Sequence, residues 1–135
     1  MNELQLQVKA LVAKFDSKYY QSIDVDEGWY QIVVDCDKQL SAIDPQYTIL
    51  QIKQKFGGLR YYFQPSSSEY NDELWEKMNA IVHTYEDIAW VTCEVTGNPG
   101  VLMKSSSGWY KTLDPEWAKT GLFHTEYTVV NKAIL

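Results

Sequence analysis

Residues 50–63 read Leu50-Gln-Ile-Lys-Gln-Lys-Phe-Gly-Gly-Leu-Arg-Tyr-Tyr-Phe63, two strand-like runs on either side of Gly57-Gly58. Paired glycines favour two-residue turns, because glycine adopts positive φ without strain. The stretch therefore predicts a β-hairpin that turns at these two glycines. The resulting register sets five pairs of residues opposite one another: Phe56 with Leu59, Lys55 with Arg60, Gln54 with Tyr61, Lys53 with Tyr62, and Ile52 with Phe63.

The two faces of this hairpin differ in chemistry, because side chains alternate along a strand. The apolar face is predicted to carry Ile52, Phe56, Leu59, Tyr61 and Phe63. The opposite face is predicted to carry Lys53, Lys55, Arg60 and Tyr62. Like charges opposite each other cost a few tenths of a kcal/mol, so folding alone gains nothing from this basic face. Its four residues are the candidate binding site for a ligand or a protein partner.

Composition limits the classes of protein to consider. A chain of 135 residues is the size of one domain and can bury about two-thirds of its unfolded surface without disulfides or metal ions. Hydrophobic residues make up 45% and charged residues 22%, which excludes wholesale disorder. A net charge of −6 argues against a general affinity for nucleic acid. We therefore expect one domain over residues 1–135, with nucleic acid disfavoured as a partner.

Cysteine usage and hydropathy predict the compartment. Cys36 and Cys93 belong to no Cys-x-x-Cys pair, and the N-terminal residues lack the apolar segment of a signal peptide. No apolar run approaches the roughly 20 residues of a membrane span. These features predict a cytoplasmic protein with no membrane partner.

Apolar spacing predicts three helices, over residues 2–16, 27–42 and 69–89. Asn2 is the expected N-cap of the first helix, and Asp44-Pro45 is expected to end the second. Beyond Cys93, residues 101–113 predict a second, smaller hairpin. Further on, residues 115–118 suit a helical turn, and residues 125–130 are β-prone and suit an edge strand. The predicted fold class is α+β, with helices packed on a small antiparallel sheet that contains the Gly57-Gly58 hairpin.

Several segments together resemble a family of small uncharacterised proteins from bacteria and their phages. The resemblance spans about residues 27–118 and rests on four motifs: Gly28-Trp29, the 51–62 hairpin with its Lys-Phe-Gly-Gly-Leu-Arg-Tyr-Tyr core, the Thr92-Cys-Glu-Val-Thr-Gly97 turn, and Gly108-Trp-Tyr-Lys-Thr-Leu113. No biochemical function is established for that family. The resemblance therefore implies a phage or prophage setting rather than an activity.

The same resemblance bears on metal binding. Many members of the family carry Cys-x-x-Cys after the long helix and Cys-x-x-His after the tryptophan, a pattern similar to a zinc ribbon. In this chain Cys93 keeps the first position, whereas Thr96, Asp114 and Trp117 occupy the other three. Structural zinc takes four ligands, mostly thiolate and imidazole, and one thiolate with one carboxylate does not hold it firmly. The expectation is no zinc and no other cofactor.

The sequence also argues against an enzyme. No histidine is placed beside Cys93 by any local pattern, and the glycines follow neither the phosphate-loop nor the dinucleotide-binding spacing. Among binding functions, the favoured hypothesis is a protein-interaction or inhibitor module, such as a phage-derived accessory or anti-defence protein. Its acidic surface or its Tyr-rich hairpin would contact the partner.

Two alternatives stay open. The chain could bind a small anionic ligand such as a nucleotide, or a nucleic acid, through Lys53, Lys55, Arg60 and Tyr62. Or the hairpin is scaffold, with its basic face neutralised by acidic residues of a neighbouring helix. The sequence indicates no oligomeric state.

Overall fold

The predicted hairpin is formed by β2 (Thr48–Lys55) and β3 (Gly58–Gln64), but its turn lies one residue earlier than predicted. In the computed structural model, which describes residues 1–18, 21–120 and 126–130, Lys55 pairs with Gly58. The turn residues are therefore Phe56 and Gly57, whose φ angles of 54° and 89° suit a type I′ turn. The prediction of a turn at Gly57-Gly58, with positive φ at Gly58, is wrong.

The earlier turn changes the register but not the faces. The observed pairs include Lys53 with Arg60, Gln51 with Tyr62, and Ile52 with Tyr61. Relative to the predicted register, residues 51–55 of β2 each lie opposite a β3 residue two positions earlier in the sequence. A shift of two positions keeps every side chain on the face predicted for it. The four candidate residues therefore share one face, as predicted, on the side opposite the buried Ile52 and Tyr61. Phe56 was wrongly assigned to the apolar face, since it lies in the turn.

The fold is α+β, as predicted, with helices packed on small sheets that are mainly antiparallel. The sheet of the hairpin also contains one parallel pair. The short strand β1 (Ile23–Asp24) pairs in parallel with β2, which gives the order β1-β2-β3. Its register sets Asp24 beside Lys53. The carboxylate of Asp24 therefore lies on the strand next to Lys53, one of the four candidate binding residues.

The three predicted helices are confirmed, with adjusted bounds. Helix α1 (Glu3–Ala10) starts at a capping box between Asn2 and Gln5 and continues as the 3₁₀ turn η1 (Leu11–Lys14). The 3₁₀ turn η2 (Glu27–Trp29) leads into α2 (Tyr30–Ile43), which ends at Asp44. Helix α3 (Asp72–Ala89) begins at Asn71, whose side chain accepts the Leu74 N–H. No helix among the described residues has the length and apolar character to cross a membrane.

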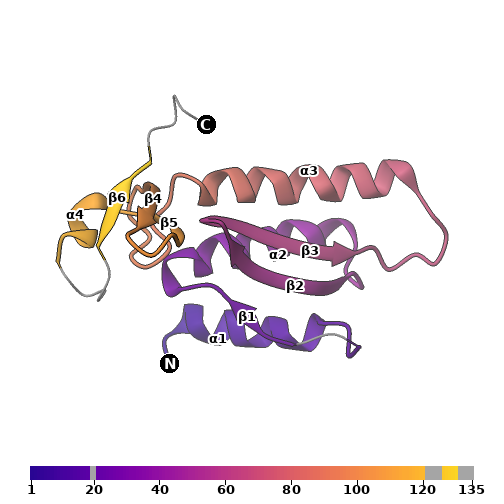
Figure 1. Ribbon diagram of the computed structural model, residues 1–135. Coiled ribbons are helices and arrows are strands. Elements are labelled where there is room, and N and C mark those ends of the chain that lie inside the picture. Colours follow the sequence, from indigo (N-terminus) through magenta and orange to yellow (C-terminus); the bar gives the residue numbers. More distant parts are fainter. Residues whose placement is uncertain (19–20, 121–125, 131–135) are drawn as a thin grey trace.

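These helices cover only one side of the sheet. In Figure 1, α2 lies behind the hairpin, α3 runs along β3, and α1 lies beyond β1. The core fills the space between the helices and the sheet. Its largest buried side chains are Trp29, Leu40, Ile49, Ile52, Leu59, Tyr61 and Met78. The side of the sheet that faces the viewer in Figure 1 is crossed by no described helix.

A second sheet packs against the hairpin tip. It contains β4 (Val101–Ser105), β5 (Tyr110–Leu113) and β6 (Tyr127–Val129) in the antiparallel order β5-β4-β6, with the short helix α4 (Pro115–Ala118) beside it. The predicted second hairpin and edge strand are thus present. Thr112 Oγ1 donates to the Gly57 carbonyl at 2.8 Å, and Gln54 Nε2 donates to the Tyr110 carbonyl at 2.7 Å. These bonds fix the tip of the first hairpin on β5.

Candidate functional site

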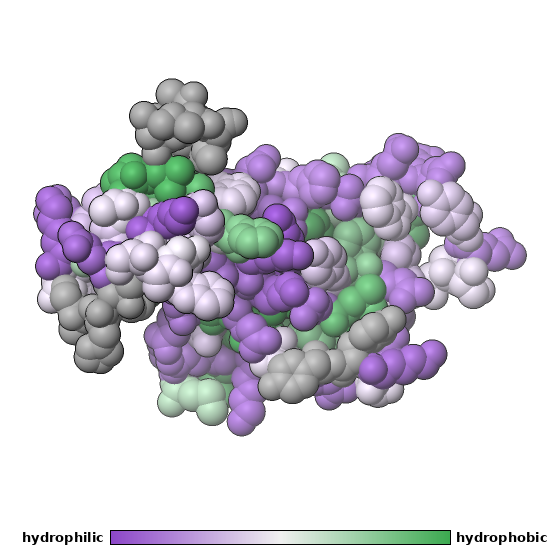
Figure 2. Space-filling view, in the orientation of Figure 1, coloured by the Kyte–Doolittle hydropathy of each residue, from purple (hydrophilic) through white to green (hydrophobic). Residues whose placement is uncertain are grey.

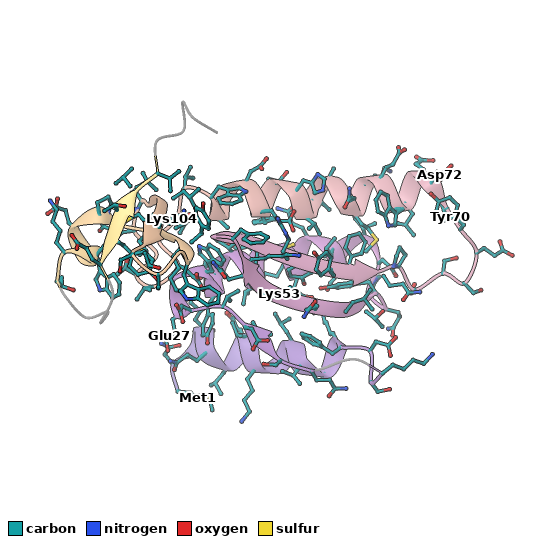
Figure 3. The ribbon with its side chains drawn as sticks, viewed as in Figure 1. Met1, Glu27, Lys53, Tyr70, Asp72 and Lys104 are labelled. Atoms are coloured by element: carbon teal, nitrogen blue, oxygen red, sulfur yellow. The ribbon has the colours of Figure 1, made fainter. Side chains whose placement is uncertain are left out.

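The candidate site is the open side of the β1-β2-β3 sheet, called here the Lys53 face and defined by Lys53, Lys55, Arg60 and Tyr62. Lys55 and Tyr62 are exposed, while Lys53 and Arg60 are half-buried. Figure 3 shows Lys53 on the side of the sheet toward the viewer, away from α2. Hydrophilic residues cover the middle of this face in Figure 2. The structure therefore brings all four predicted residues together on one accessible surface.

The cations of the Lys53 face, Lys53, Lys55 and Arg60, form no ion pair with any residue that the structure describes. Asp24 is the ladder neighbour of Lys53, but its carboxylate accepts the Ser22 hydroxyl at 2.7 Å. Two cations thus stand opposite each other in the ladder, an arrangement that destabilises a strand pair.

The outer edge of β3 is closed by α3. Glu86 of α3 accepts the Tyr61 N–H at 3.1 Å through Oε2. Burial raises the pKa of this carboxyl, and the hydrogen bond from Tyr61 and the nearby Arg60 charge partly oppose that rise. Because the edge N–H is already bonded, a partner strand cannot pair with β3 at this point. At this point of β3 the face of the sheet stays open to a partner, whereas its edge does not.

A polar depression of about 510 Å³ opens beside Lys53. Its wall contains a group that we call the Glu94 cluster, formed by Glu94, Lys111 and Asp26. Lys111 Nζ lies 3.3 Å from Glu94 Oε1 and 3.2 Å from Asp26 Oδ2. Glu94 Oε2 also accepts the Asp26 N–H at 3.0 Å. The cluster joins the second sheet to the segment between β1 and η2.

Burial governs the protonation of the Glu94 cluster. The Glu94 side chain is only 3% exposed, and this burial raises its pKa, although Lys111 and the Asp26 N–H oppose the rise. Burial lowers the pKa of Lys111, but the carboxylates of Glu94 and Asp26 outweigh it, so the lysine pKa is raised. Lys111 is therefore a charged, fully engaged partner of Glu94. It is not a free cation for a ligand.

A second buried network lies under the sheet. Asp37 Oδ1 accepts the Tyr47 hydroxyl at 2.6 Å and Lys14 Nζ at 2.8 Å, and the Tyr47 and Tyr61 hydroxyls are 2.6 Å apart. Burial is the main cause of the raised pKa of both tyrosines. Burial also raises the pKa of the nearby Cys36 thiol, which keeps that thiol protonated and unreactive. This network joins η1 and α2 to the hairpin and has a structural role.

The turn after α3 is held by packing and hydrogen bonds. Cys93 is buried, and its Sγ accepts the Thr96 N–H at 3.5 Å. Trp117 packs against the hydrophobic cluster that contains Cys93, and Asp114 caps α4 by accepting the Glu116 N–H. The described residues contain no group of three or more His, Cys, Asp or Glu suited to a metal ion. The positions that the resemblance relates to zinc ligands thus lie close to one turn but do not form a ligand set.

The sequence did not reveal the Glu94 cluster. Its members are separated by up to 85 residues, and no local pattern relates Asp26 to Lys111. Only the packing of the second sheet against the first brings them together.

Comparison of the chain with family models, with curated proteins and with solved structures found no match.

Proposed function

We propose that this chain is a non-catalytic binding protein whose Lys53 face binds an acidic segment of another protein. The observation that supports the proposal most strongly is the Lys53–Arg60 pair, two cations opposite each other on a sheet face that no described helix covers. Such a pair costs stability in the free protein. A carboxylate-rich partner would remove that cost and gain charge-assisted hydrogen bonds, to which the Arg60 guanidinium is especially suited.

The form of the surface favours a protein segment over a small anion. The depression next to Lys53 is lined by Asp24, Asp26 and Glu94 as well as by Lys53 and Lys111, so its carboxylates outnumber its cations. A phosphate group there would be repelled. An extended acidic segment can instead contact Lys55 and Arg60, which do not line the depression, together with Lys53, which does.

The same facts weigh against the scaffold hypothesis. That hypothesis needs acidic residues of a helix over the basic face, whereas the described helices lie on the opposite side and at the edge of the sheet. Glu86 is the helical carboxylate near Arg60, and it is engaged by the Tyr61 N–H. One shared carboxylate does not neutralise three cations.

A non-catalytic role is supported by the state of the thiols. Both cysteines are buried, and burial raises the pKa of Cys36. A protonated, inaccessible thiol is a poor nucleophile.

Selection from a random-peptide display library tests the proposal. The immobilised wild type should enrich peptides with clustered Asp and Glu, and the Lys53→Glu/Arg60→Glu variant should not. A matched control, Lys9→Glu/Lys38→Glu, changes the net charge equally at exposed positions on α1 and α2 and should still enrich acidic peptides.

Two results would refute the proposed function. One is enrichment of peptides without acidic character. The other is equal enrichment of acidic peptides by the wild type and the charge-reversed variant, since the binding would then not depend on the Lys53 face. Tight binding of a nucleotide by the wild type, with no acidic peptide enriched, would favour the anionic-ligand hypothesis instead.

A further inference from the structure

Phe56 occupies a position that folding does not favour. Its φ of 54° lies in the left-handed region, where a type I′ turn selects Asn, Asp or Gly. Phe56 is 67% exposed, so burial does not compensate for the backbone conformation. Side chains held in unfavourable backbone conformations concentrate at binding sites.

A second exposed ring lies beside Phe56 and comes from the other hairpin. Trp109, in the β4–β5 connection, is 72% exposed. Together with Phe56, Tyr110 and the neighbouring Gln54, Lys55 and Gly108, it lines a depression of about 280 Å³, which we call the aromatic notch. Binding pockets for small molecules usually measure about 300–1,000 Å³, so the notch has room for one large side chain.

Hydrogen bonds join the two walls of the notch, and two lysines lie against its rings. The Gln54–Tyr110 and Thr112–Gly57 hydrogen bonds described above hold its two walls together. Lys55 Nζ lies 5.7 Å from the centre of the Phe56 ring, and Lys104 Nζ lies 5.4 Å from that of Tyr110. Figure 3 shows Lys104 in the second sheet, to the left of Lys53. The residues that line the notch include no carboxylate, although the chain as a whole is acidic.

We propose that the aromatic notch receives one bulky apolar side chain of the same acidic segment that binds the Lys53 face. The inference rests on the proposed function and adds the partner motif to it. Lys55 belongs to both surfaces, so a bound segment can pass from one to the other without a break. Flanking lysines select an acidic segment, and the exposed rings select an aromatic or large aliphatic anchor within it. Buried aromatic anchors of this kind dominate many protein interfaces.

A double-mutant cycle tests the inference. The probes are an acidic peptide enriched by the wild type and the same peptide with its bulky apolar residue replaced by alanine. Trp109→Thr should weaken binding of the first peptide about tenfold or more and leave binding of the alanine peptide unchanged. Phe56→Asn should weaken binding in the same way while raising the melting temperature, because asparagine suits the turn.

The outcomes separate this inference from the proposed function. If charge reversal of Lys53 and Arg60 abolishes binding while Trp109→Thr and Phe56→Asn change nothing, the notch is refuted and the proposed function stands. If the aromatic variants weaken binding and charge reversal does not, the Lys53 face takes no part in binding, and the proposed function fails together with the inference that rests on it. Trp109-dependent binding of oligo-deoxythymidine or of phosphatidylserine vesicles, with no peptide enriched, would overturn both in favour of that partner.

Discussion

Reversing both charges of the Lys53–Arg60 pair should leave the fold almost as stable as the wild type. The Lys53→Glu/Arg60→Glu variant breaks no ion pair, since neither side chain makes one among the described residues. Cross-strand repulsion between two cations is replaced by repulsion between two anions, so this contribution cancels. New repulsion arises from Asp24 and Glu86, each about 0.5 kcal/mol at a partly solvated surface. The expected loss in free energy of unfolding is about 1 kcal/mol.

Urea unfolding monitored by circular dichroism measures this loss, with Lys9→Glu/Lys38→Glu as the control for net charge. The single variant Arg60→Glu sharpens the test, because it sets opposite charges across the ladder and should be a few tenths of a kcal/mol more stable than the double variant. A loss of several kcal/mol in the double variant would refute the reasoning. It would mean that buried carboxylates depend on these cations, as the scaffold hypothesis requires.

Three further replacements test the parts that support the site. Lys111→Met should cost about 3 kcal/mol near neutral pH by leaving the buried Glu94 without its cation. Because the pKa of Glu94 is raised in the folded protein, protonation of Glu94 favours folding, and the loss of stability should shrink as the pH falls. Urea unfolding at several pH values measures this dependence. A loss that is the same at every pH would contradict the role of Lys111 as the partner of Glu94. Gly58→Ala should lower the melting temperature sharply, since a Cβ there would lie 2.5 Å from the Trp90 ring, and an unchanged melting temperature would show that the ring moves aside freely. Phe56→Asn should raise the free energy of unfolding by about 1 kcal/mol, and a decrease would show that the ring contributes to packing.

The faces of the hairpin could be predicted from the sequence, whereas its turn could not. Alternation along each strand, combined with a two-residue turn, assigns Lys53 and Arg60 to one side, and a register shift of two leaves this assignment unchanged. The predicted turn is misplaced because paired glycines favour positive φ at both positions, whereas Gly58 does not have a positive φ. Its lack of a side chain instead makes room for the Trp90 ring at the end of α3, a contact between distant segments that no local pattern contains.

The site was predictable only in part, for a similar reason. Lys53, Lys55, Arg60 and Tyr62 lie within one hairpin, so strand periodicity was enough to group them. The Glu94 cluster and the aromatic notch each combine residues of the two sheets. Their formation depends on how the hairpin tip packs on β5, through hydrogen bonds that local propensity does not specify.

The central claim is that the Lys53 face is a binding surface for an acidic protein segment. Its most direct test is a nuclear magnetic resonance titration of the isotope-labelled protein with an acidic peptide enriched by the wild type. Binding at the Lys53 face should give amide shift changes concentrated at residues 51–55 and 58–62, and these changes should be lost in the Lys53→Glu/Arg60→Glu variant. Shift changes confined to α1 and α2, or changes that persist in the charge-reversed variant, would contradict this claim.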